Sequence, residues 1–99
     1  MNVTHRLDKD ILYIAVEGRI DASNAAEAEE MIFGIKNNNT GKHTVIDADK
    51  LEYISSAGIR VLLRAYKKMN FIQGKTRIET VNNIVRKVFE MTGLLQMLE

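Results

Sequence analysis

The chain has 99 residues, a length that supports one hydrophobic core, and we predict a single domain over residues 1–99. Hydrophobic residues make up 45% and charged residues 27% of the sequence, which is typical of a folded domain and excludes wholesale disorder. The absence of cysteine excludes disulfides, thiolate metal sites and cysteine nucleophiles. The net charge of +1 disfavours a dedicated nucleic-acid-binding protein, whose surface is strongly basic.

The sequence also bears on membrane association. Its apolar runs are far shorter than the roughly 20 residues that a membrane-spanning helix requires. The first ten residues include the charged side chains of Arg6, Asp8, Lys9 and Asp10, where a secretory signal has its apolar stretch. We therefore expect a cytoplasmic protein without a membrane span.

The first half of the chain predicts a hairpin, a helix and a strand. Val3–Leu7 and Ile11–Val16 are extended stretches separated by a polar turn, and the second is apolar on both faces, as in a central strand that ends before Gly18. A helix should follow, with a polar residue as its N-cap; the candidates are Asp21 and Ser23. Its apolar residues near one face are Ala25, Ala28, Ile32 and Ile35, and the next predicted strand is Thr44–Ala48.

The second half contains the clearest helical pattern. From Ala57 onward, apolar residues recur at helical spacing: Ile59, Leu62, Leu63, Tyr66 and Met69. A strand at Thr76–Val81 and a helix capped by Asn82 or Asn83 follow, and we expect the apolar tail over 94–98 to pack on the core. This order predicts an α/β fold with a mixed four- to five-stranded sheet and helices packed mainly on one face.

Four segments resemble motifs of the STAS family, the domain of anti-sigma factor antagonists and related regulators. The segment from Tyr53 to Leu63, YISSAGIRVLL, resembles the family signature, and the segment from Val16 to Asp21 resembles the motif before its first helix. Asp47 resembles the aspartate of the family's third strand, and the segment from Met91 to Leu94 resembles the end of its last major helix. Because the segments occur in order over nearly the whole chain, the resemblance implies a STAS-like (SpoIIAA-like) fold.

The resemblance implies that Ser56 is the family's regulated, phosphorylated serine. Ser55 stands where the family has an aspartate, which makes Ser55 the alternative acceptor. On the residues alone, a serine ahead of an amphipathic helix is also a natural N-cap, so Ser56 has a structural and a functional interpretation. A phosphate at the helix start would meet free backbone donors and add roughly −1.5 to −2 charges.

The residues around this serine are expected to contact a partner protein. They are Asp21, Tyr53, Ile54, Ser55, Ala57, Gly58, Arg60 and Arg64. We expect Asp21 to cap the first helix as well, and Tyr53 and Ile54 to be either core or contact residues. The two arginines belong to a basic stripe with Lys67 and Lys68, for which a solvated face is the simpler interpretation.

Other chemistry finds little support in the sequence. Asp47 and Asp49 have the spacing of a magnesium pair, but loop hydrogen bonding is the simpler role. His43 and His5 are poorly placed to act as a base for Ser56, and neither a G-x-S-x-G elbow nor a phosphate-binding G-x-x-x-x-G-K motif is present. We expect neither catalysis nor a cofactor or metal.

The resemblance to the STAS family implies that the protein is an anti-sigma factor antagonist. The resemblance implies that the unmodified protein binds an anti-sigma factor with serine kinase activity and so releases a sigma factor. The kinase would phosphorylate Ser56, and a PP2C-type serine phosphatase would reverse the modification. No direct contact with nucleic acid or membrane is expected. The alternative is a STAS-type regulatory scaffold or nucleotide-binding module that phosphorylation does not control.

Overall fold

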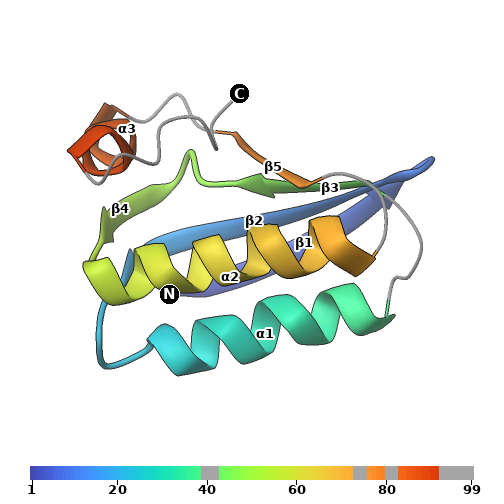
Figure 1. The fold of residues 1–99 in the computed structure, drawn as a ribbon, viewed down its shortest axis with the longest axis horizontal. Helices are drawn as coiled ribbons and strands as arrows, with labels where there is room; N and C mark the ends of the chain where they lie inside the picture. The colour runs from blue at the N-terminus through green and yellow to red at the C-terminus, as the bar shows by residue number, and fades with distance from the viewer. Residues whose placement is uncertain (39–42, 73–75, 80–82, 92–99) are drawn as a thin grey trace.

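A computed structural model describes residues 1–38, 43–72, 76–79 and 83–91 (Figure 1). These residues form five strands and three helices, in the order β1 (Asn2–Asp8), β2 (Ile11–Ile20), α1 (Ala25–Asn38), β3 (His43–Asp47), β4 (Leu51–Ile54), α2 (Ser56–Ile72), β5 (Thr76–Glu79) and α3 (Asn83–Met91). The predicted hairpin, central strand and three helices are confirmed. The sequence interpretation missed β4, and residues 80–82 and the apolar tail lie outside the described residues.

The sheet is mixed, and β2 is its centre. This strand pairs antiparallel with β1 and parallel with both β3 and β4, while β5 extends the sheet beyond β3. β3 pairs with the first half of β2, up to Ala15, and β4 pairs with the last part, from Gly18 to Ile20. The strand therefore does not end before Gly18, as the sequence suggested, but continues to Ile20.

Gly18 marks the change of partner along β2. Its φ is +92°, a left-handed conformation that glycine adopts without a steric penalty, and the register with β4 shifts immediately after it. Its N–H donates to the carbonyl of Lys50 at 3.1 Å, which ties β2 to the turn ahead of β4. The glycine thus redirects β2 so that one strand serves two parallel neighbours.

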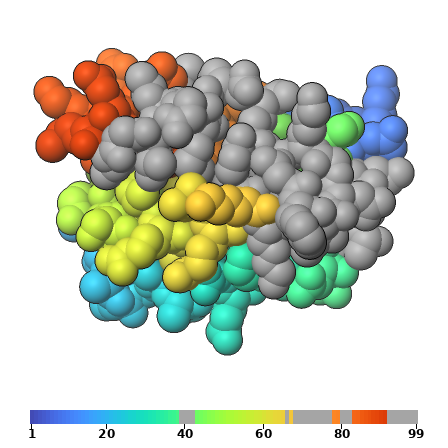
Figure 2. Space-filling model, in the orientation of Figure 1, coloured from blue at the N-terminus to red at the C-terminus, as the bar shows by residue number. Residues whose placement is uncertain are grey.

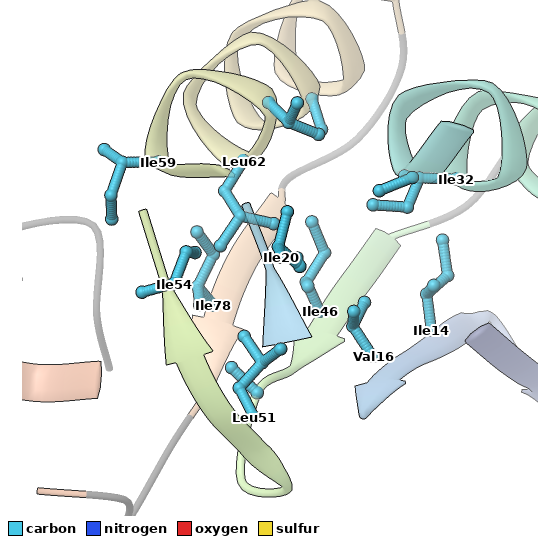
Figure 3. Packing of buried hydrophobic residues seen from close by; sticks show 14 of the residues in the cluster. Ile14, Val16, Ile20, Ile32, Ile46, Leu51, Ile54, Ile59, Leu62 and Ile78 are labelled. Atoms are coloured by element: carbon cyan, nitrogen blue, oxygen red, sulfur yellow. The ribbon is translucent and has the colours of Figure 1, made fainter. Parts of the chain in front are cut away.

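The main core lies between the sheet and helices α1 and α2, which cover the same face (Figure 1). Alternate side chains of β2 point into this core, and Ile32 of α1 and Leu62 of α2 meet them from the helical layer (Figure 3). α3 contacts β4 and buries Val85 and Phe89. Among the described helices, none is long and apolar enough to cross a membrane.

The buried stripe of α1 differs from the sequence pattern at its last position. Ala25, Ala28 and Ile32 are buried as predicted, but Lys36 completes the stripe and Ile35 is only half-buried. Lys36 is 5% exposed, and its Nζ donates to the hydroxyl of Thr44 at 3.2 Å. Burial penalises the charged amine and lowers the pKa of Lys36 below its ordinary value.

The burial of Lys36 predicts that the free energy of unfolding depends on pH in the alkaline range. Just below the ordinary lysine pKa, the unfolded chain holds more protons than the folded one, so the free energy of unfolding rises with pH. Lys36→Met should remove this rise, whereas Lys67→Met, at an exposed position of α2, should keep it. Urea unfolding at pH 7 and at about pH 10 measures the effect. An unchanged pH dependence in Lys36→Met would contradict it.

Candidate functional site

The candidate site forms where β2 and β4 end side by side. Ile20 and Ile54 are register partners in this parallel pair, and the N–H of Ser55 donates to the carbonyl of Ile20 at 2.9 Å. The chain segments that leave the two strands therefore start at the same edge of the sheet. The structure thus brings together Asp21 and the Ser55–Ser56 pair, as the sequence interpretation required.

The two serines have different structural roles. The hydroxyl of Ser55 accepts the N–H of Gly58 at 3.2 Å, and the carbonyl of Ser55 accepts the N–H of Ile59 at 2.9 Å. Ser55 is therefore the N-cap of α2, which corrects the interpretation of Ser56 as the cap. Ser56 is the first residue of the helix and is exposed, and its hydroxyl makes no hydrogen bond to another described residue.

Some of the side chains around Ser56 are exposed at the surface, and others are buried beneath it. Tyr53 is 40% exposed and lies under the guanidinium of Arg19, which sits 4.4 Å from the ring centroid. Ile54 and Gly58, which the sequence placed among the partner contacts, are buried in this structure and support the surface from below. Ala57 is half-buried. Figure 2 shows the first turns of α2 at the surface between α1 and α3.

Gly58 is where α2 approaches the strand ends most closely. A Cβ at this position would lie 2.7 Å from Cγ1 of Ile54 and 2.9 Å from Cγ2 of Ile20. Both isoleucines belong to the core, so they have little room to move away. A residue without a side chain is therefore needed to seat the first turn of α2 on β2 and β4.

Asp21 orders the turn before α1 but does not cap the helix. Its Oδ1 accepts the N–H of Ser23 at 2.9 Å and the hydroxyl of Ser23, and these bonds hold the pKa of the Asp21 carboxyl below its ordinary value. Asn24 occupies the N-cap position, since its carbonyl accepts the N–H of Ala28 at 2.9 Å. The expected capping by Asp21 or Ser23 is thus wrong. An asparagine directly before the helical pattern was the signal for the cap.

The basic stripe of α2 is not uniform. The Nε of Arg64 lies 2.5 Å from Oε2 of Glu29, and this ion pair joins α2 to α1. Arg60 is exposed and forms no ion pair with a described residue. Of the two arginines predicted to contact a partner, Arg60 is therefore the one whose guanidinium is not held in an ion pair with another described residue.

The other polar groups fit loop structure better than catalysis. Oδ1 of Asp47 accepts the N–H of Asp49 at 3.0 Å, which confirms the loop hydrogen bonding expected for this pair. The described residues hold no group of three or more potential metal ligands. His43 pairs with the start of the ten-residue strand β2, whose far end lies beside Ser55. At roughly 3.3 Å per residue, His43 lies about 30 Å from the serines, and His5, the register partner of Ile14, lies about 20 Å from them, so neither histidine is placed to act as a base for Ser56.

The roles of the two serines predict that substitution by alanine lowers stability at Ser55 and has little effect at Ser56. Ser55→Ala removes an N-cap and should lower the free energy of unfolding by about 1 kcal/mol. Ser56→Ala removes an exposed hydroxyl without an internal partner, so its effect should stay within about 0.5 kcal/mol. Urea denaturation of the two variants makes the comparison. A larger loss in Ser56→Ala would show that Ser56 is the cap.

Two glycines in helices provide a matched test of the packing at the site. Gly58→Ala should lower stability by roughly 1–3 kcal/mol, because the added methyl overlaps two core side chains. Gly34→Ala, within α1, meets no atom within 4 Å and should raise stability by roughly 0.5–1 kcal/mol through helix propensity. Thermal and urea unfolding give both values. Equal effects at the two positions would contradict the close approach at Gly58.

Comparisons with known proteins agree with this architecture. The family model of the STAS domain matches residues 2–99. A Bordetella bronchiseptica protein named as an anti-sigma factor antagonist, BtrV, is 32% identical over 85 residues, which cover 86% of this chain and 72% of that protein. The solved structure of an anti-sigma factor antagonist from Mycobacterium paratuberculosis superposes with a TM-score of 0.84 at 20% identity, over 98% of this chain and 81% of that one.

The anti-sigma factor antagonist SpoIIAA has been solved in two forms that resemble this chain. Its unphosphorylated form gives a TM-score of 0.78 at 17% identity, over 99% of this chain and 86% of that one. The phosphorylated form, from Bacillus, gives 0.71 at 16% identity, over 99% and 89% of the two chains. The predicted SpoIIAA-like α/β fold is therefore confirmed, and this chain belongs to the STAS domain family.

Proposed function

We propose that this protein is an anti-sigma factor antagonist and that phosphorylation of Ser56 is its switch. One observation carries the choice of residue: Ser55 caps α2, so the exposed hydroxyl of Ser56 is left without a structural task. A kinase can therefore modify Ser56 without breaking a hydrogen bond of the described fold. The relatives named as antagonists, and the two forms in which SpoIIAA was solved, support this assignment.

The proposed partner is an anti-sigma factor with serine kinase activity. In this proposal the unmodified protein binds the anti-sigma factor and thereby frees the sigma factor, so that transcription proceeds in the cytoplasm. The contact surface surrounds Ser56 and includes the exposed part of Tyr53, the turn of Asp21, the half-buried Ala57 and the guanidinium of Arg60. A PP2C-type serine phosphatase restores the binding form.

Electrostatics explains how the modification acts. A phosphate adds roughly −1.5 to −2 charges at neutral pH, on an exposed residue in the middle of the proposed contact surface. A partner surface that fits a neutral hydroxyl then faces a charge that it must desolvate or repel. Switches of this kind change binding by about one to three kcal/mol, which corresponds to roughly fivefold or more in affinity.

Ser55 is the less suitable acceptor. Its hydroxyl is bonded to the N–H of Gly58, and the residue is half-buried beside the end of β2. Modification there would compete with the cap and push a charged group against the strand ends. We therefore assign the phosphate to Ser56, and mass spectrometry of the phosphorylated protein distinguishes the two residues.

Substitutions at Ser56 test the proposal. Ser56→Ala should bind the anti-sigma factor kinase and resist phosphorylation, while Ser56→Asp should bind at least tenfold more weakly because of its charge. Asn37→Asp is the matched control, since it adds the same charge at an exposed position in the last turn of α1, far along the helix from the site. Isothermal titration calorimetry with the kinase that co-purifies with Ser56→Ala measures the affinities. Equal binding of the alanine and aspartate variants at position 56 would refute the switch.

A further inference from the structure

The arginines of the described residues differ in what they contact. Arg6 lies over the ring of Tyr13 at 4.0 Å from its centroid, and Arg19 lies over the ring of Tyr53 at 4.4 Å from its centroid. Arg64 is paired with Glu29. Arg60 has no such contact with any described residue, although it is only one turn from the proposed phosphorylation site.

Helix geometry places Arg60 beside Ser56. The two residues are related by i, i+4 on α2, a spacing that puts their Cβ atoms about 5–6 Å apart on one face. Because Cα–Cβ bonds tilt toward the helix N-terminus, the Arg60 side chain leans over the turn that contains Ser56. Arg64 lies one turn farther along, and its ion pair directs it toward α1.

The charges of this turn favour a phosphate paired with Arg60. The first turn of α2 contains no acidic residue, so no carboxylate within it competes for the guanidinium. An anion placed four residues before a cation is the favourable order on a helix, and a guanidinium matches the oxygens of a phosphate. Both side chains are exposed, so they can meet without rearrangement of the core.

We infer that Arg60 binds the phosphate of phosphorylated Ser56 as an i, i+4 ion pair on the surface of α2. The inference rests on the proposed function for the identity of the modified residue, and it adds how the phosphate changes the charges of the contact surface. In the unmodified protein Arg60 is an exposed cation that suits an acidic group on the partner. The phosphate thus adds a negative charge and, through the ion pair, also withdraws a positive one from the contact surface.

The test uses the full chain with phosphoserine incorporated genetically at position 56, so no kinase is required. A ³¹P NMR titration measures the second pKa of the phosphate, which a neighbouring cation lowers. We expect Arg60→Gln to raise this pKa by roughly 0.2–0.4 units relative to the parent, the size of a helix-surface ion pair. Arg60→Lys should restore part of the difference. Arg64→Gln, with the same loss of charge one turn away, should leave the pKa within about 0.1 unit of the parent value.

Two results would overturn the inference. One is an unchanged phosphate pKa in Arg60→Gln, and the other is an equal rise in Arg60→Gln and Arg64→Gln, which would indicate only a general effect of net charge. Circular dichroism of each variant confirms that α2 is intact. Because the phosphate is installed without the kinase, an unchanged phosphate pKa would refute the ion pair with Arg60 but not the proposed effect of Ser56 phosphorylation on binding. Equal binding of the kinase by Ser56→Ala and Ser56→Asp would refute the proposed switch but not the ion pair.

Discussion

The site depends on the parallel pairing of the ends of β2 and β4. The hydrogen bond from the Ser55 N–H to the Ile20 carbonyl terminates this ladder and fixes where α2 can begin. Gly58 then lets the first turn of the helix rest directly on Ile20 and Ile54. The cap, the exposed hydroxyl of Ser56 and the adjacent turn of Asp21 all take their positions from these contacts.

Patterns within single elements made most of the fold predictable, whereas β4 needed tertiary information. The hairpin, the central strand and α2 follow from apolar spacing along the chain. β4 is only four residues long, and its buried residues, Leu51 and Ile54, show no alternation. The strand forms because β2 continues to Ile20 while β3 covers only its first half, which leaves a free edge. No property of residues 51–54 themselves indicates that this part of β2 lacks a second parallel neighbour.

The sequence located the candidate site but could not assign roles to neighbouring polar residues. Ser55 and Ser56 are equally good caps by residue type, and the same holds for Asp21, Ser23 and Asn24 before α1. The choice is made by the sheet: Ser55 is bonded to Ile20 and therefore stays outside the helix, so its hydroxyl faces the free N–H of Gly58. Likewise, the ion pair that engages Arg64 depends on the packing of α1 against α2, which local spacing does not reveal.

The separation of the cap from the proposed acceptor has a thermodynamic consequence. If a single serine capped α2 and also carried the phosphate, each modification would exchange a cap worth about 1 kcal/mol for a new set of contacts, and helix stability would change with the switch. With Ser55 as the cap, the hydroxyl of Ser56 contributes no hydrogen bond within the described fold, so modification leaves the helix start in place. In the proposed switch, the phosphate therefore changes the charge of the contact surface without breaking a hydrogen bond of the described fold, so that a small domain changes its affinity while it keeps its structure.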